Sequence, residues 1–115
     1  QYTYARCCSV LRKGGAFNRS AVDYTKLTDA PAMAVVKAIG AFPDAVHAAM
    51  EKNEPYLVSR AVIDICAAFN KFYYDNRIMD DDPAIRNARL ILTEAARTAV
   101  KTGLYLIGVN APERM

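Results

Sequence analysis

Apolar and polar residues follow one another along this chain with the period of α-helices. In the first thirteen residues an apolar stripe falls at positions i, i+3, i+4 and i+7, made up of Tyr4, Cys7, Cys8 and Leu11. Gly14 and Gly15 come next, and glycine readily takes the left-handed conformation that ends a helix. The pattern therefore predicts an opening helix that ends at this glycine pair.

Prolines mark where the later helices begin. Four of them open an apolar-periodic segment, in the first-turn position that proline prefers: Pro31, Pro43, Pro55 and Pro83. They predict four more helices, over about residues 30–40, 43–52, 54–78 and 83–107. A polar loop over residues 16–26 precedes them, and we expect it to be ordered by docking onto the rest of the domain.

The last two predicted helices are the longest and form the scaffold. The apolar stripe of the first of these continues into Asn76 and Arg77, which indicates that it leaves the core for solvent; its apolar members are Val58, Val62, Ile65, Cys66, Phe69 and Tyr73. The stripe over 83–107 consists mostly of small residues, so its backbone can approach a neighbouring helix closely. A short turn predicts that the two are antiparallel. Because no segment alternates apolar and β-branched residues with polar ones, we expect an all-α bundle of about five helices and no sheet.

The outward face of the opening helix carries an unusual row of side chains. An aromatic ring, a guanidinium, a hydroxyl and an ammonium follow at i, i+4, i+7 and i+11, namely Tyr2, Arg6, Ser9 and Lys13. Single-stranded nucleic acid is bound by this combination, in which rings stack on bases and cations meet phosphates. An ordinary solvated helix face accounts for the periodicity equally well.

Composition and length indicate one globular domain. The 115 residues are 53% hydrophobic and 23% charged, and this length supports a core of its own. No apolar run approaches the ~20 residues of a membrane span, and the polar, aromatic start is unlike a secretory signal. We therefore expect a cytoplasmic protein with no membrane partner. The chain starts inside a predicted helix without Met, so we interpret it as part of a larger protein.

Charge is distributed more informatively than the net value of +3 suggests. Residues 1–26 hold five cations and one anion, whereas acidic residues gather at Asp80, Asp81 and Asp82, so we expect one end of the domain to be basic. Cys7, Cys8 and Cys66 form neither a CxxC pair nor a zinc-binding set. They are expected to be reduced, buried thiols.

No residue pattern indicates an active site. His47 is the only histidine and lies in an alanine-rich segment without a nucleophile at catalytic spacing, so we interpret it as structural. The three consecutive aspartates lack the alternation and the glycine of a metal loop. Asp82 is better explained as the N-cap of the last helix. No nucleotide-binding or nucleophile motif is present, and we expect no catalytic residue, no metal ligand and no cofactor in this chain.

Four segments together resemble one family. Residues 1–13 (QYTYARCCSVLRK) are similar to the Q-Y-x-x-A-R-x-x-S-(I/V)-L-R-K helix that opens the C-terminal, DALR-type anticodon-binding domain of arginyl-tRNA synthetases, although Tyr4 stands where that family often has histidine. Residues 69–79 (FNKFYYDNRIM), 83–92 (PAIRNARLIL) and 106–115 (LIGVNAPERM) resemble its later motifs. Residues 16–28 are the least similar part. The related domain of cysteinyl-tRNA synthetase shares the architecture, but Q-Y-x-x-A-R with A-P-E-R-M is typical of the arginine enzyme.

The resemblance implies a domain that binds the anticodon stem and loop of arginine tRNA. An absent catalytic domain of the same chain would use ATP and Mg²⁺ to attach arginine to that tRNA, and the protein is expected to be a monomer. Contacts to the anticodon loop are implied for Tyr2, Arg6, Tyr73, Arg77 and Met115. Ser9 and Lys13 share the face of the first two, and Arg89 is interpreted as a structural ion-pair partner.

A second hypothesis belongs to another functional class. Aromatic and arginine side chains also anchor protein interfaces, so the same face is compatible with a helical protein-interaction module. Salt separates the two hypotheses, because RNA binding weakens steeply with ionic strength and an apolar interface does not.

Overall fold

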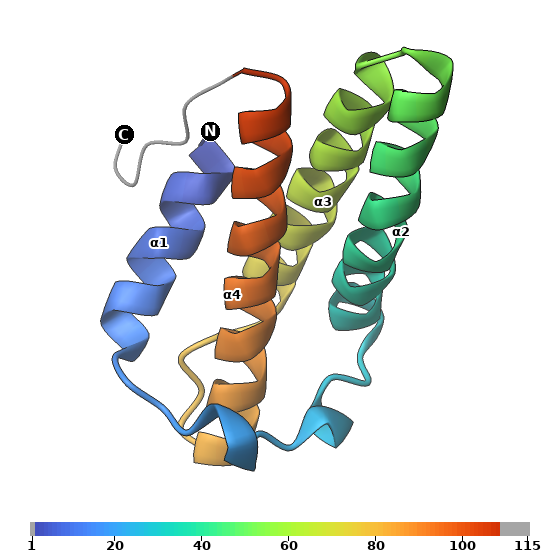
Figure 1. Cartoon of the computed structure of the whole chain (residues 1–115). Helices are drawn as coiled ribbons and strands as arrows, with labels where there is room; N and C mark the ends of the chain where they lie inside the picture. Colours follow the sequence, from blue (N-terminus) through green and yellow to red (C-terminus); the bar gives the residue numbers. More distant parts are fainter. Residues whose placement is uncertain (1, 109–115) are drawn as a thin grey trace.

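A computed structural model describes residues 2–108 and shows four α-helices that run in alternating directions (Figure 1). The helices are α1 (Tyr2–Gly14), α2 (Ala30–Lys52), α3 (Tyr56–Asp75) and α4 (Pro83–Leu106). No strand is present in this part of the chain. The all-α class and the antiparallel packing of α3 on α4 are as predicted, and α1 ends where the glycine pair predicts, with Gly15 at φ 65°.

Residues 2–108 contain four α-helices rather than the five predicted, because the predicted segments 30–40 and 43–52 form one helix. Pro43 lies inside α2 and is exposed there. Inward-facing residues recur every three or four positions on both sides of it, namely Ala32, Val35, Ile39, Phe42, Val46 and Ala49. The core-facing stripe is therefore continuous through the proline. Its burial outweighs the one backbone hydrogen bond that proline cannot donate.

Aspartates cap α2 and α4, whose first turns contain Pro31 and Pro83. Asp29 Oδ2 accepts a hydrogen bond from the backbone N–H of Ala32 at 3.1 Å, and Asp82 Oδ1 accepts one from that of Ala84 at 2.9 Å. The predicted role of Asp82 is therefore confirmed. Asp29 Oδ2 also accepts from Asn76 Nδ2 at 2.8 Å, which ties the start of α2 to the end of α3.

The core lies between the four helices and depends on close approach of α4 to α3. Phe69 and Phe72 of α3 are fully buried. Gly103 of α4 packs against Val62, and a Cβ atom at this glycine would lie only 2.2 Å from Val62 Cγ2. The small residues of α4 thus allow the close contact that the sequence predicts.

The connection between α1 and α2 contains two short 3₁₀ helices, Arg19–Ala21 and Tyr24–Lys26. It docks through Arg19, whose Nε donates to Glu94 Oε1 of α4 at 2.9 Å and whose guanidinium lies 4.8 Å from the centre of the Phe17 ring. We expected this segment to lack structure of its own, but it forms two 3₁₀ helices in addition to its contact with α4 through Arg19.

Helix α2 is long and apolar enough to cross a membrane when only length and composition are considered. The sequence predicted no membrane span, since no apolar run approaches the ~20 residues that a span needs. In the structure α2 packs along α3 and α4 as a member of the bundle. A single helix of this kind is weak evidence for a membrane span.

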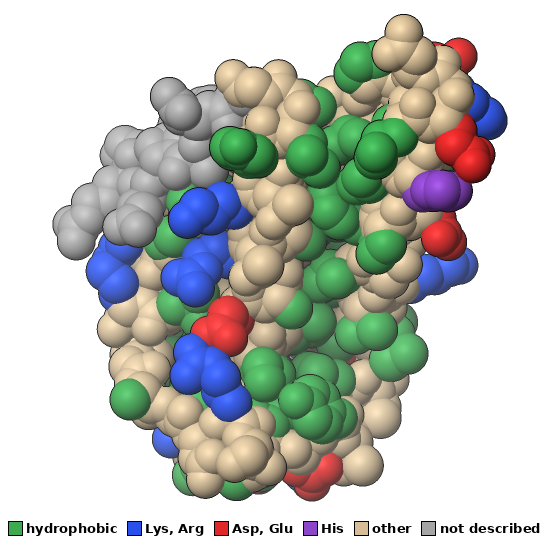
Figure 2. All heavy atoms as spheres, in the orientation of Figure 1, with side chains coloured by type: hydrophobic (Ala, Val, Ile, Leu, Met, Phe, Trp, Pro, Cys, Tyr) green, Lys and Arg blue, Asp and Glu red, His purple; other side chains and the backbone are tan. Residues whose placement is uncertain are grey.

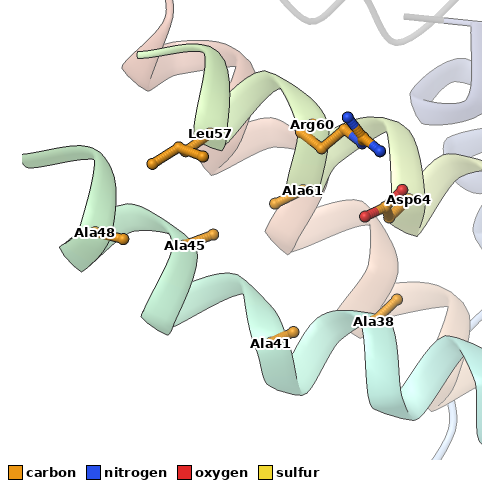
Figure 3. A pocket seen from close by; sticks show the side chains of 8 residues that line it. All are labelled: Ala38, Ala41, Ala45, Ala48, Leu57, Arg60, Ala61 and Asp64. Atoms are coloured by element: carbon orange, nitrogen blue, oxygen red, sulfur yellow. The ribbon is translucent and has the colours of Figure 1, made fainter. Parts of the chain in front are cut away.

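The two sides of the bundle differ in character. Figure 2 shows Lys and Arg side chains gathered over α1 and α4, and hydrophobic side chains over α2 and α3. A shallow apolar groove lies between the outer faces of α2 and α3 (Figure 3). Its floor consists of small side chains, and Arg60 and Asp64 line it as well; the apolar members are Ala38, Ala41, Ala45, Ala48, Leu57 and Ala61.

Candidate nucleic-acid interface

A groove runs between α1 and the C-terminal end of α3. It consists of two adjoining hollows that share Val10, Lys13 and Tyr73. Every predicted site residue that the structure describes lines one or both of them: Tyr2, Arg6, Ser9, Lys13, Tyr73 and Arg77. Met115 lies outside the described residues. Residues more than sixty positions apart in sequence are thus brought into one surface.

Helix α1 presents its polar row to this groove because its other side is held in the core. Tyr4, Cys7 and Cys8 are buried, as the stripe predicts. The opposite row remains accessible, with Lys13 exposed, Ser9 half-buried and the Tyr2 side chain 57% exposed.

Arg6 lies at the centre of a cluster of aromatic rings. Its Cζ atom is 4.6 Å from the ring centroid of Tyr2, 4.4 Å from that of Tyr73 and 5.1 Å from that of Tyr74. These distances are within the range of cation–π attraction. Arg6 Nη2 also donates to the Tyr2 hydroxyl at 2.5 Å and to the Tyr74 hydroxyl at 3.4 Å. We call Tyr2, Tyr73 and Tyr74 the tyrosine platform.

The environment of Arg6 favours its charged form. Partial burial lowers the pKa of the guanidinium, but hydrogen bonds to the hydroxyls of Tyr74 and Tyr2 outweigh that effect and raise the pKa from its ordinary value. The groove therefore contains a permanent positive charge surrounded by rings.

Asn70 of α3 holds the Arg6 side chain by a hydrogen bond. Its Oδ1 accepts from Arg6 Nη1 at 3.2 Å, and its Nδ2 donates to the Thr3 hydroxyl at 3.2 Å. Thr3 is buried, so this amide links the interior of the α1–α3 contact to the guanidinium. Asn70 is not predictable from the sequence, because a lone asparagine beside an apolar stripe has no signature of its own.

Tyr73 and Tyr74 extend the aromatic surface. Tyr73 is half-buried, with its ring centroid 6.4 Å from that of Phe69. Tyr74 is 74% exposed, and its ring stands edge-on to that of Tyr73, at 5.6 Å and 83°. Tyr74 was also missed as a site residue, since it falls off the apolar stripe. The only signal was its place beside Tyr73 in an aromatic-rich helix end.

The far end of the groove combines cations and acids. Arg77 is exposed and approaches Asp81 at 3.9 Å between Nη2 and Oδ1. Arg89 is mostly buried and donates from Nη1 to the backbone carbonyl of Arg77 at 2.7 Å, with Asp80 Oδ2 at 3.8 Å. Arg89 is therefore a structural residue, as predicted. That one end of the domain is basic stays a prediction, and at this end of the groove Asp81 and Asp80 lie near Arg77 and Arg89.

The shape of the groove favours an extended ligand. Its two hollows, of about 270 and 280 Å³, adjoin at Val10, Lys13 and Tyr73 and form one elongated groove. An open surface of rings and cations suits stacked bases and a passing phosphate chain better.

The other candidate residues have structural explanations. Burial raises the pKa of the Cys7 thiol to about 12, so this thiol stays protonated at neutral pH. His47 is exposed on α2, with Nε2 3.1 Å from Glu51 Oε1. Among residues 2–108, no group of three or more His, Cys, Asp or Glu side chains could hold a metal ion.

Comparison with known proteins decides the family. Residues 1–115 match the DALR anticodon binding domain along their whole length. The chain belongs to the DALR anticodon-binding domain family. This DALR domain is 45% identical over 115 residues to an arginine–tRNA ligase of Halothermothrix orenii and 44% identical to one of Clostridioides difficile. All of the domain is covered in both comparisons, but only 20% of each relative.

A solved structure agrees with the fold. The arginyl-tRNA synthetase of Thermus thermophilus matches this DALR domain with a TM-score of 0.89 at 30% sequence identity. The match covers 99% of the domain and 20% of the Thermus chain. The domain thus spans about a fifth of the length of the proteins that it matches.

Proposed function

We propose that this domain binds the anticodon stem and loop of arginine tRNA, as one part of an arginine–tRNA ligase. The observation that carries the proposal is the groove between α1 and the C-terminal end of α3, where four residues of α1, Tyr73 of α3 and Arg77 of the turn after α3 line one surface. Unpaired bases can stack on the rings while Lys13 and Arg77 meet phosphates. The family to which the chain belongs is named for anticodon binding.

The same proposal covers the larger protein. Residues 1–115 would form a single C-terminal domain beside a catalytic domain that uses ATP and Mg²⁺, with no cofactor bound by this domain. The relatives, of which the chain covers 20%, support this arrangement. We propose a monomeric cytoplasmic enzyme without a membrane partner. Met115 stays a predicted contact to the anticodon loop, and no finding supports the protein-interaction alternative.

A titration tests the function directly. Purified protein should bind arginine tRNA more tightly than a non-cognate tRNA. The affinity should fall steeply from the lower to the higher of two salt concentrations, because release of counterions from the tRNA is less favourable at high salt. Equal affinity for both tRNAs, or an affinity indifferent to salt, would contradict the proposal.

A further inference from the structure

We infer that Arg6 is the hub of a preassembled tyrosine platform rather than a phosphate contact, that Asn70 is its positioning residue, and that Tyr74 is an additional base-stacking residue. The inference rests on the proposed function and deepens it by assigning separate tasks within the groove. Rings take the bases, Arg6 holds the rings, and Lys13 takes phosphate charge.

The contacts of Arg6 leave little capacity for a phosphate. A guanidinium has five N–H donors. Nη1 is engaged with Asn70, and Nη2 with two tyrosine hydroxyls, while three rings lie within 5.1 Å of Cζ. A phosphate oxygen that took the same N–H groups would displace these partners, and the rings would then lose their common anchor.

Lys13 offers the opposite arrangement. It is exposed, it lies where the two hollows meet, and no hydrogen bond or ion pair of its ammonium is seen among residues 2–108. A solvated ammonium of this kind can approach a phosphate without breaking existing contacts. Arg6 and Lys13 therefore have different tasks although they lie on one face of α1.

Asn70 fixes where the hub lies. Its carbonyl oxygen holds Arg6, and its amide nitrogen is held by the buried hydroxyl of Thr3. Both ends of the amide are thus determined by partners on α1, whereas Asn70 itself belongs to α3. The orientation of the Arg6 guanidinium relative to α1 and α3 is therefore set before any ligand binds, which reduces the conformational entropy lost on binding.

Tyr74 completes the platform on its solvent side. Its ring is 74% exposed, yet it is held edge-on by Tyr73 and by a hydrogen bond from Arg6. An exposed ring that is already oriented can stack on a base at low entropic cost. Tyr56 is 60% exposed at the opposite end of α3 and provides a matched control.

The first test measures binding of arginine tRNA to purified protein at several salt concentrations. Tyr74→Ala should weaken binding about 5- to 150-fold, the range for loss of one base stack, whereas Tyr56→Ala should leave it unchanged. Lys13→Ala should reduce the slope of log affinity against log salt by about one unit. Arg6→Ala should weaken binding without changing that slope.

The second test distinguishes the bridging role of Arg6 from the effect of its positive charge. Arg6→Lys keeps the positive charge but replaces the planar guanidinium fork with a compact ammonium that cannot span the same partners, so it should weaken binding as much as Arg6→Ala does. Asn70→Leu should weaken binding in the wild-type background and have no further effect when combined with Arg6→Ala. Asn70→Asp keeps an acceptor for Arg6 and should retain more affinity than Asn70→Leu. Melting temperatures identify any variant that fails to fold, in which case Arg6→Lys and Tyr74→Ala decide.

The outcomes distinguish this inference from the proposed function. If wild-type protein does not prefer arginine tRNA, the proposed function is wrong and the inference falls with it. If wild-type protein binds as proposed, the inference alone is overturned when Arg6→Lys restores affinity, when Arg6→Ala lowers the salt slope by one unit, or when Tyr74→Ala matches Tyr56→Ala.

Discussion

At the scale of single residues, Tyr73 lies where the apolar stripe of α3 runs out into the groove. One neighbour of its ring is the fully buried Phe69 and another is the guanidinium of Arg6. The side chain is half-buried, so it is a member of the core and of the candidate interface at once. Truncating it should therefore affect stability and binding together.

We expect Tyr73→Ala to reduce tRNA binding by roughly 1–3 kcal/mol, as for other rings on which a base stacks. Its cost in unfolding free energy should stay below the roughly 3–5 kcal/mol of a fully buried aromatic, because part of the ring is already in water. Tyr73→Phe keeps the ring and should preserve most of both quantities. Urea unfolding and tRNA titration of the same preparations measure the two effects, and a cost confined to stability would remove Tyr73 from the interface.

At the scale of helices, α2 shows how one continuous packing stripe can override a strong local signal. Pro43 lies one position after buried Phe42, and the inward-facing residues keep their spacing across it. A proline at the first turn of a new helix and a proline tolerated inside a long helix have different energetic consequences. Substitution can therefore distinguish the two arrangements.

Pro43→Ala should stabilise the protein. Alanine restores a backbone donor inside α2 and is about 3 kcal/mol more favourable than proline in a helix interior. Proline's restriction of the unfolded chain returns about 0.4–1 kcal/mol of that difference, which leaves a net gain of roughly 2 kcal/mol. Pro83→Ala, at the first position of α4, should be neutral or slightly destabilising. Thermal unfolding of both variants is the measurement, and a loss of stability in Pro43→Ala would favour two separate helices.

Two glycines of the helices should respond in opposite directions to alanine. At Gly103 the added Cβ would meet Val62 at 2.2 Å, so Gly103→Ala should destabilise the α3–α4 contact by about 1–3 kcal/mol. At Gly40, inside α2, no atom lies within 4 Å of that position, and Gly40→Ala should stabilise by up to about 1 kcal/mol. The pair is compared by urea denaturation. Equal effects would mean that α3 and α4 separate enough to admit a methyl group.

At the scale of the whole molecule, the sequence predicted the features that depend on hydrophobic periodicity and on the residues at helix ends. The stripe through Cys7 gave the orientation of α1, Gly15 its end, and Asp82 the start of α4. The outward row of α1 predicted the residues that α1 contributes to the groove. Asn70 and Tyr74 were missed because their roles exist only once α1 and α3 are packed together, and no local pattern encodes a contact across more than sixty residues.

If the groove only binds the anticodon loop, a substitution in it should change the kinetic constants for tRNA and leave those for the other substrates of the proposed ligase unchanged. In the full-length enzyme, Tyr73→Ala should raise the KM for arginine tRNA, because the contact contributes to binding at a distance from the reacting groups. At saturating tRNA the KM values for arginine and ATP should stay unchanged, since no nucleotide-binding motif occurs in this domain. Steady-state aminoacylation with each substrate varied in turn measures the three constants. Tyr56→Ala serves as the control and should leave all of them at the wild-type values. An increase in the KM for ATP or arginine with Tyr73→Ala would show that this end of α3 communicates with the catalytic domain, and the groove could then no longer be treated as an independent tRNA contact.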